Sequence, residues 1–310
     1  MTTPSPVRPS GLRSVALGTP DVAAAEAFYT ATWALAPVAR QDGAVYLRGS
    51  GSPHHLLSLH PRPAAELLDV CFNAASRADV DALAAAVRKA GAGPVGEAGA
   101  AKDPAGGYGF SFRDPEGRHF TIVAGDATHA DASEKADVPD HLSHVVLCSA
   151  DVPKSTAFFT DVLGFRVSDR TKMMNFVRCN SDHHQIALAY AEASSLNHIA
   201  FYMPDLESVM RGAGRVKDAG YPIEWGVGRH GPGNNVFAYF IGPDEVVIEY
   251  TSEVEKVDDS YVVRGPEEWK WPPGRTDHWG ISAPPSLRLQ AAQKKIRFAI
   301  DIAPGEQTPR

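Results

Sequence analysis

The chain has 310 residues, of which 44% are hydrophobic and 22% charged, and its formal net charge is −7. This composition is typical of a globular protein of about two domains, and the acidic excess argues against a nucleic-acid binder. No apolar run is long enough to span a membrane, and the first residues lack the apolar stretch of a signal peptide. Three cysteines are too few for a disulfide framework, so we expect a soluble cytoplasmic protein.

The sequence contains an internal repeat. The segment that begins at residue 12 aligns with the one that begins at 142, and the paired histidines at 54–55 align with those at 183–184. Two further matches follow in the same order, and the offset changes only from 130 residues at the first match to 128 at the last. The chain is therefore predicted to be a tandem duplication of a unit of roughly 115 residues.

The second unit shows the predicted elements most clearly. A strand through Val145 is followed by Asp151 as an N-cap, a helix that ends at Gly164, and two short strands. A strand over 197–203 then starts the same scheme again, with Asp205 capping a helix that ends at Gly220 and three strands after it. Each unit is therefore predicted as a strand, a helix and further strands, twice over.

The predicted domain boundaries follow from the repeat. We expect a tail over 1–10, a first domain over 11–126, a polar linker over 127–139 and a second domain over 140–252. Residues 253–310 lie outside the repeat, and we expect this extension to pack on the second domain.

Matched positions in the two units differ in a way that predicts a metal site in the second. At three of them the first unit has Ser14, Asp69 and Thr121. The second unit has two imidazoles and a carboxylate there, which is the ligand set of a non-haem Fe(II) site with open positions. All three lie in predicted strands, and a concave sheet can direct them to one point. These candidate ligands are His144, His198 and Glu249.

Candidate catalytic residues lie near the ligands in sequence. His184 precedes an apolar strand, and an imidazole that titrates near neutral pH can move protons. The first unit also has paired histidines without a ligand set, so His184 alone would prove little, and we expect His183 to be a solvated turn residue. A Gly-Pro-Gly-Asn-Asn turn separates His230 from Tyr239, so both can fold back toward the strand of Glu249.

The run GRHGPGNNVFAYF and the later VIEYT, with LSHVVL and LNHIAF upstream, resemble the type I extradiol ring-cleaving catechol dioxygenases of the vicinal oxygen chelate superfamily. The resemblance covers essentially residues 11–290. It implies an α+β fold of two tandem modules, each built from paired βαβββ units, with iron only in the C-terminal module. It also implies that the three candidate ligands bind iron, that His184 is the acid–base residue, and that His230 and Tyr239 form hydrogen bonds beside the metal.

The resemblance also implies a reaction. It is the Fe(II)-dependent extradiol (meta) cleavage of a small aromatic diol with O₂ as cosubstrate, which gives a muconic semialdehyde-type product in aromatic catabolism. Mn(II) is an alternative metal, because the ligand set does not separate the two. Family members are often homo-oligomers, so we expect a dimer or tetramer. The turn over 242–245 departs from the family's Asp-Pro-x-Gly pattern, which changes a turn and leaves the ligands intact.

Candidate substrate-binding residues are less constrained by the sequence. Relatives that cleave carboxylated catechols have an arginine near the loop before His230, where this chain has Trp225, which favours an uncharged catechol. Arg275 in the extension could still reach a carboxylate. Apolar and polar residues near the ligands are further candidates, and core packing is the alternative for the apolar ones. They are Val146, Met174, Phe176 and Asn197.

Two other functions fit the same sequence features. A glyoxalase or epimerase-like enzyme of the superfamily usually adds a fourth protein ligand to its metal, and metal identity would distinguish it. A non-catalytic binding module on the same fold is the second alternative, because fold does not fix function. Absence of O₂ uptake across a panel of catechols would favour the binding module.

Overall fold

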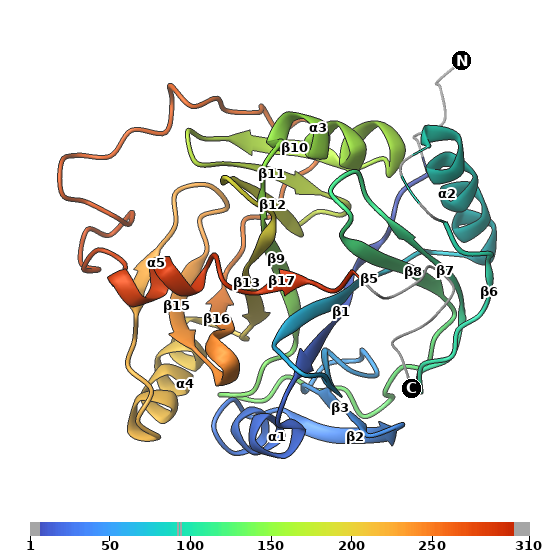
Figure 1. The fold of residues 1–310 in the computed structure, drawn as a ribbon. Coiled ribbons are helices and arrows are strands. Elements are labelled where there is room, and N and C mark those ends of the chain that lie inside the picture. The colour runs from blue at the N-terminus through green and yellow to red at the C-terminus, as the bar shows by residue number, and fades with distance from the viewer. Residues whose placement is uncertain (1–6, 92, 94, 301–310) are drawn as a thin grey trace.

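The first half of the chain folds into a strand, a helix and three strands, and then repeats that series (Figure 1). The computed structural model describes residues 7–91, 93 and 95–300. The first series is β1 (Gly11–Thr19), α1 (Val22–Ala31), β2 (Ala36–Gln41), β3 (Ala44–Arg48) and β4 (Leu57–Pro61). The second is β5 (Glu66–Asn73), α2 (Arg77–Ala90), β6 (Gly99–Ala100), β7 (Tyr108–Arg113) and β8 (His119–Ala124).

The second half follows the same scheme, which confirms the predicted duplication. Its first series is β9 (His141–Ser149), α3 (Val152–Ala157), the π-helical turn η1 (Phe158–Val162), β10 (Arg166–Arg170), β11 (Met174–Arg178) and β12 (Ile186–Tyr190). Its second is β13 (Ser195–Tyr202), α4 (Leu206–Asp218), β14 (Trp225–Arg229), β15 (Val236–Ile241), the 3₁₀ turn η2 (Pro243–Glu245) and β16 (Val247–Ser252). The side chains of Asp151 and Asp205 cap α3 and α4, as predicted.

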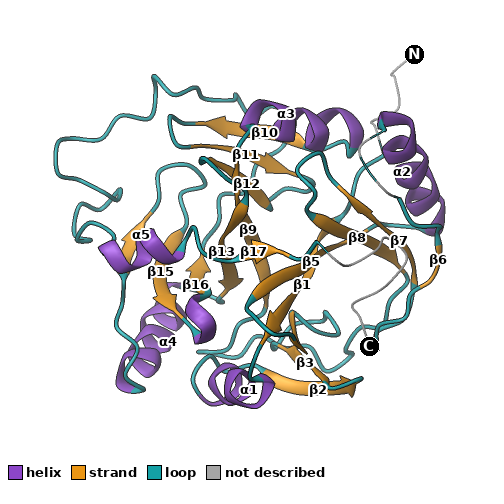
Figure 2. Cartoon of the chain, in the orientation of Figure 1, coloured by secondary structure: helices purple, strands orange, loops and turns teal. Residues whose placement is uncertain are grey.

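Each half forms one mixed sheet with its helices on the outside (Figure 2). The first sheet has the order β2-β3-β4-β1-β5-β8-β7-β6, and the second has the order β10-β11-β12-β9-β13-β16-β15-β14. In the second sheet the central strands β9 and β13 are antiparallel, and each has a parallel neighbour, β12 and β16 respectively. The three strands that carry the predicted ligands are therefore adjacent at the centre of this sheet.

The two halves share one hydrophobic core. Trp33 follows α1 and has no exposed surface, and its ring stacks on that of Tyr250 in β16 with centroids 3.7 Å apart. The Tyr250 hydroxyl donates a hydrogen bond of 2.8 Å to the backbone oxygen of Trp33. The buried apolar residues of both sheets form one continuous cluster. Burial of this surface between the halves holds the two sheets together.

The C-terminal extension contacts both halves. Its helix α5 (Leu287–Ala292) packs on β15 and β16 through Leu289 and Ala292. Its last strand, β17 (Arg297–Phe298), pairs in parallel with Glu66 and Leu67 of β5 in the first sheet and crosses the centre of Figure 1 in red. Besides the predicted partner, the second domain, the extension thus also contacts the first sheet. The physical reason is that β8 pairs only with the later part of β5, so the edge at Glu66 and Leu67 accepts another strand.

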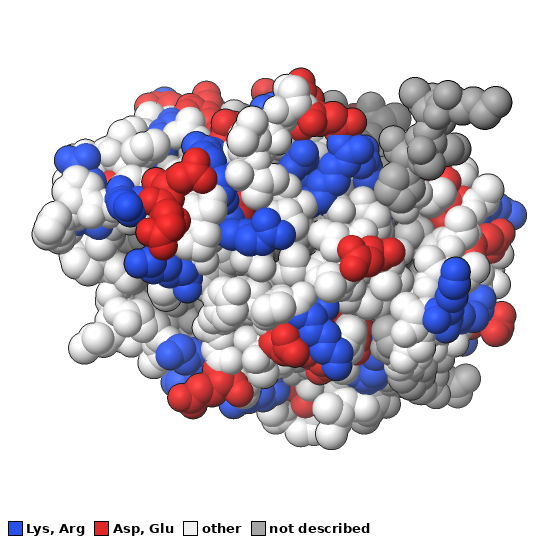
Figure 3. Space-filling view, turned by 90° about the horizontal axis from the view of Figure 1, so that it is seen from above, with Lys and Arg blue, Asp and Glu red and all other residues white. Residues whose placement is uncertain are grey.

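The surface shows no large block of one charge on the face drawn in Figure 3, where acidic and basic side chains are interspersed. None of the helices in the described part of the chain is long and apolar enough to cross a membrane. Residues 1–6 of the predicted tail and 301–310 of the extension lie outside the described residues.

Candidate metal centre and active site

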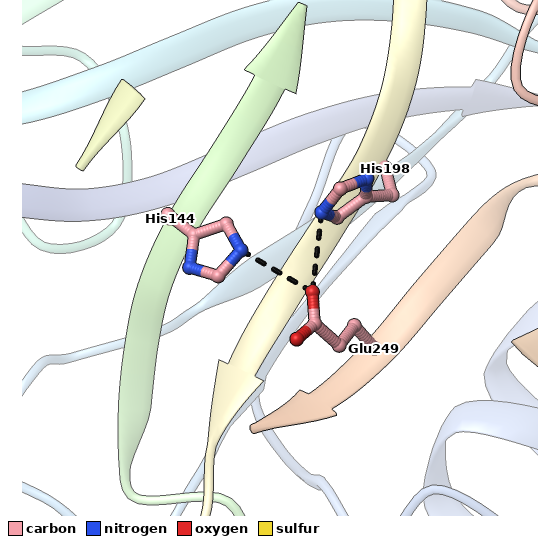
Figure 4. Close-up of side chains that lie close together, drawn as sticks. All are labelled: His144, His198 and Glu249. Carbon is pink, nitrogen blue, oxygen red and sulfur yellow. Dashed lines mark hydrogen bonds and ion pairs between the residues drawn. The ribbon is translucent and has the colours of Figure 1, made fainter. Parts of the chain in front are cut away.

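Three side chains from neighbouring strands converge inside the second sheet: His144 from β9, His198 from β13 and Glu249 from β16 (Figure 4). The Oε2 atom of Glu249 lies 3.2 Å from Nε2 of His144 and 3.1 Å from Nε2 of His198. All three residues are buried, and the Glu249 carboxylate has no exposed surface. The structure thus brings together the three residues that the sequence comparison selected.

Strand register explains this convergence. Ala200 in β13 lies opposite both His144 in β9 and Glu249 in β16. His198 is two residues before Ala200, so its side chain leaves the strand on the same face. The small side chain of Ala200 leaves room between the three polar groups.

The outer nitrogen of each histidine has a hydrogen-bonding partner, so that Nε2 faces the carboxylate. His198 Nδ1 lies 2.8 Å from Asn197 Oδ1, and His144 Nδ1 lies 3.0 Å from Ser143 Oγ. The Asn197 amide nitrogen lies 3.6 Å from Cys148 Sγ, which leaves its oxygen to accept the proton of His198. Nε2 of a neutral His198 then carries a lone pair that faces an oxygen of the Glu249 carboxylate. A cation between the nitrogen and the oxygen stabilises this arrangement. The donor set therefore fits a divalent metal ion.

The charge of Glu249 is compensated chiefly by the two histidines of the cluster. Burial alone would raise the pKa of its carboxyl, but His144 and His198 outweigh that effect and hold the pKa below its ordinary value. Burial lowers the pKa of His198 despite the nearby Glu249 carboxylate, which acts in the opposite direction. Asn235 Nδ2 lies 3.5 Å from Glu249 Oε1 and donates a 2.7 Å hydrogen bond to Thr251, which orients the amide toward the carboxylate.

His184 lies beside the ligands. Its ring centroid is 4.3 Å from that of His144, and its side chain is buried. Burial lowers the pKa of His184 well below its ordinary value, and neighbouring imidazoles add to the effect. His183 is also fully buried, so our prediction of a solvated turn residue was wrong. The reason is the carboxylate of Asp169, which lies 2.9 Å from His183 Nε2 and compensates the burial of that polar ring.

His230 and Tyr239 lie on the other side of the cluster. Tyr239 lies opposite Glu249 in the β15–β16 pair, and its hydroxyl is 3.0 Å from His230 Nε2 and 3.5 Å from His198 Nε2. Burial lowers the pKa of His230 to about 4 and raises that of Tyr239 well above its ordinary value. The turn between them folds both side chains toward the ligands, as the sequence predicted.

The candidate substrate-binding residues occupy three positions around the cluster. Val146, Phe176 and the partly buried Met174 belong to a small apolar cluster, and the Phe176 ring is 5.0 Å from that of His184. Trp225 stacks on Tyr239 with centroids 5.1 Å apart. Asn197 accepts a hydrogen bond from His198, so it supports a candidate ligand.

The first sheet has a different cluster at the matched place. Arg13 is buried there and forms ion pairs of 2.7 Å with Asp103 and with Asp126. Asp69, which matches His198, is paired with His119 Nδ1 at 2.9 Å. Among the described residues, His144, His198 and Glu249 are the one group of such side chains with ligand atoms close enough to hold a metal ion. In the first sheet, ion pairs thus occupy the place where the second sheet has a candidate metal centre.

Comparisons with known proteins place this fold in a family. Residues 141–250 match the Glyoxalase/Bleomycin resistance protein/Dioxygenase superfamily, and residues 14–123 match a Glyoxalase-like domain. A solved structure that is 40% identical, the Mn(II)-bound glyoxalase from Novosphingobium aromaticivorans, aligns over 89% of this chain and 92% of its own with a TM-score of 0.83. The chain belongs to the Glyoxalase/Bleomycin resistance protein/Dioxygenase superfamily and has its vicinal oxygen chelate fold in two modules.

The curated relatives include a metapyrocatechase and a trihydroxybiphenyl dioxygenase. Metapyrocatechase 2 of Cupriavidus necator is 34% identical over 140 residues, which are 44% of this chain and 41% of that protein. The 2,2',3-trihydroxybiphenyl dioxygenase of Sphingomonas paucimobilis is 29% identical over 226 residues, which are 67% of this chain and 76% of that protein. The matched segment thus spans less than half of the first relative and about three quarters of the second. The resemblance inferred from the sequence motifs is confirmed.

Proposed function

We propose that this chain is a metal-dependent extradiol dioxygenase that cleaves the ring of a catechol-type aromatic diol with O₂. The observation that carries the proposal is the arrangement of His184, His230 and Tyr239 around the His144–His198–Glu249 cluster. The names of the two curated relatives support the same reaction class. Fe(II) is the metal we propose, with Mn(II) as the alternative, and the product would be of the muconic semialdehyde type.

His144, His198 and Glu249 would hold a divalent ion, which would supply Lewis-acid and templating chemistry for the diol and O₂. The protein's own groups would supply the rest of the chemistry. His184 Nε2 would take the proton of a substrate hydroxyl, and general acid–base groups of this kind typically contribute about 10²–10⁴-fold. The Tyr239 hydroxyl, supported by His230, would donate a hydrogen bond to a substrate oxygen.

The apolar side chains beside the cluster favour an uncharged ring. Val146 and Phe176 would contact the aromatic face, and Trp225 would close the side next to Tyr239. Arg275 is exposed on the extension. We therefore propose a catechol without a carboxylate as the preferred substrate, and a homo-oligomeric enzyme by analogy with the family.

A second candidate function is that of a glyoxalase, because the 40% identical Mn(II)-bound structure carries that name. Such an enzyme would isomerise the adduct of an α-ketoaldehyde and a thiol. The described residues offer three protein ligands in one cluster, whereas a glyoxalase usually uses four. The two functions differ in their need for O₂, which makes them separable in one experiment.

The first test is O₂ uptake by anaerobically purified protein loaded with Fe(II) or with Mn(II). The substrates would be catechol, 3-methylcatechol, 2,3-dihydroxybiphenyl and a carboxylated catechol, with visible absorbance recorded in parallel. Methylglyoxal with glutathione would be assayed on the same preparations. We expect stoichiometric O₂ consumption and a yellow product with an uncharged catechol.

Two variants control this experiment. Glu249→Ala should lose the metal and all turnover, whereas Thr121→Ala, at the matched position of the first sheet, should retain both. Turnover of the glutathione adduct without O₂ uptake would overturn the dioxygenase proposal. Full metal occupancy in Glu249→Ala would overturn the ligand assignment.

A further inference from the structure

Behind His184 lies a second buried histidine and behind that a buried carboxylate. His184 Nδ1 is 3.0 Å from His183 Nδ1, and His183 Nε2 is 2.9 Å from Asp169 Oδ2. His183 and Asp169 have no exposed surface. Asp169, His183 and His184 thus form a line. At its end, the His184 ring packs against that of the candidate ligand His144.

The charge state of Asp169 is fixed by several donors. Its carboxylate accepts hydrogen bonds from the Tyr261 hydroxyl at 3.0 Å and from the Arg264 backbone N–H at 2.9 Å, and it pairs with the Arg264 guanidinium at 3.3 Å. Burial alone would raise the pKa of Asp169, but the hydrogen bonds from His183 and Arg264 hold it below its ordinary value. Asp169 is therefore an anionic acceptor, and His183 Nε2 carries the proton between them.

The position of this proton determines the positions of the next ones. A neutral His183 with a proton on Nε2 has a lone pair on Nδ1. The short contact between the two Nδ1 atoms then requires His184 to donate its Nδ1–H to His183. A neutral His184 with a proton on Nδ1 has its lone pair on Nε2. That nitrogen has no hydrogen-bond partner among the described residues, so it is available to a ligand.

The first module supplies an internal comparison. His54 and His55 make the same contact, with their Nδ1 atoms 3.0 Å apart. Phe176 of β11 is matched by Tyr46 of β3 in the first module. Phe176 lies opposite Asp169 in the β10–β11 pair, whereas Tyr46 lies opposite Ala39 in the β2–β3 pair. Ala39 therefore stands where the second module has the carboxylate. His54 stacks on the ring of His129. The histidine pair therefore occurs in both modules, whereas the carboxylate occurs only beside the candidate metal centre.

We propose that Asp169 and His183 are positioning residues that hold His184 as the Nδ1–H tautomer, with Nε2 free to accept a proton from the substrate. This inference rests on the proposed function for the role of His184, but the tautomer itself does not depend on turnover. When a substrate hydroxyl gives its proton to Nε2, the oxygen keeps the electron pair. The resulting imidazolium is stabilised through His183 by the charge of Asp169. Because Tyr261 and Arg264 belong to the extension, that segment contributes to the same arrangement.

The direct test is to determine the tautomers of His183 and His184 by ¹H–¹⁵N correlation of histidine side chains. The sample is the full chain labelled with ¹⁵N-histidine, measured both metal-free and with diamagnetic Zn(II). We expect His183 as the Nε2–H form and His184 as the Nδ1–H form, with signals assigned by their loss in His183→Phe and His184→Gln. In Asp169→Asn the amide can donate to His183 Nε2, which should move both protons and leave His184 as the Nε2–H form. Arg264→Ala retains the carboxylate and should leave both tautomers unchanged. A His184 with its proton on Nε2 in the unmodified protein would overturn the proposal.

The second test uses turnover of the metal-loaded enzyme. Asp169→Asn and His183→Phe should lower kcat by about 10²–10⁴-fold, in the range known for proton-transfer groups and the carboxylates that orient them. Metal content and the anaerobic dissociation constant of the diol should stay within threefold. His183→Asn retains an acceptor for His184 Nδ1–H and should recover part of the loss. His54→Asn, the matched change in the first module, should leave kcat unchanged.

The two tests separate the two proposals. If no diol on the panel is turned over, the dioxygenase proposal fails. The measured tautomers of His183 and His184 still decide whether Asp169 and His183 hold His184 as proposed. If the diol is turned over and Asp169→Asn retains normal kcat, the positioning role is wrong and the proposed function stands.

Discussion

Asn197 determines which nitrogen of His198 is available to a metal ion, although its own side chain is not a ligand. Its Oδ1 lies 2.8 Å from His198 Nδ1, which leaves Nε2 toward Glu249. Partners of this kind typically contribute 10–100-fold in metal affinity. We therefore predict that Asn197→Leu weakens Fe(II) or Zn(II) binding by about 10–100-fold, measured by competition with a chromophoric chelator. Asn175→Leu, which removes a buried amide bonded to Thr156, is the control, and equal affinities in the two variants would contradict the prediction.

His60 makes stability depend on pH at a place remote from the ligands. Burial lowers its pKa from the ordinary 6.5 to about 4. The folded state therefore favours the neutral form of His60. The contribution of His60 to the free energy of unfolding is complete above pH 6.5 and is lost as the pH falls toward 4. The shift corresponds to about 3 kcal/mol of unfolding free energy. We predict that His60→Gln, whose amide can keep the contact with Ser58, loses less stability than the unmodified protein between pH 6.5 and 4.

Urea denaturation at pH 7.5, 5.5 and 4 would measure this effect. His278→Gln is the control, because His278 is exposed on the extension. Parallel pH curves for His60→Gln and the unmodified protein would show that burial of His60 does not govern the acid sensitivity.

At the residue scale, comparison of the two repeats was enough to select the three candidate metal ligands that the structure brings together. Three matched positions differ in chemical type, and strand alternation brings the three ligands to one face. The same comparison misled for His183, because the first unit also has paired histidines and offers no reason to bury them. Asp169 was missed because its contact joins β10 to the loop before β12 and depends on residues 261–264 of the extension. No local pattern in the sequence encodes such a contact.

At the scale of elements, α5 supports one side of the candidate active site. Leu289 is fully buried against a cluster that includes Phe237, Tyr239 and Val247. Removing such a side chain typically costs about 2–5 kcal/mol, so Leu289→Ala should lower the unfolding free energy by that amount. Because Tyr239 loses part of its packing, kcat should fall as well.

Leu287 supplies a matched control for this prediction. It lies on the same helix and is 83% exposed. Leu287→Ala should change the unfolding free energy by less than about 0.5 kcal/mol in the same urea titration. Equal effects of the two substitutions would mean that α5 does not pack on β15 and β16 in solution.

The helices of the second unit were predictable because their caps are local. Asp151 and Asp205 accept hydrogen bonds from backbone N–H groups three residues later, and Gly164 adopts a positive φ of 72°. The π-helical turn that ends the first of these helices was not predicted. Strand β17 was missed because two residues carry no periodicity, and its pairing depends on a free edge of β5. Elements that depend on distant partners therefore escape a sequence analysis.

At the scale of the molecule, the two modules differ in polar chemistry but share their apolar interior. The ion pairs of Arg13 with Asp103 and Asp126 occupy the first module at the place where the second has the candidate metal ligands. The shared core gives the first module a mechanical role, because Trp33 packs on Tyr250, the residue after Glu249. Arg215 of α4 also donates a hydrogen bond to the backbone of Thr32. The first module therefore supports the strand that carries the candidate ligand Glu249.

This shared core predicts that the two modules unfold together. Far-UV circular dichroism and tryptophan fluorescence should give coincident urea curves with one transition. Trp33→Ala should move that single transition by about 3–5 kcal/mol, the usual cost of removing a buried large aromatic side chain. Trp279→Ala removes a ring at the surface that contacts Arg229 and should cost at most about 1 kcal/mol. Two separate transitions, or a Trp33→Ala variant in which only one of two transitions moves, would show that the modules are independent and that β16 needs no support from the first.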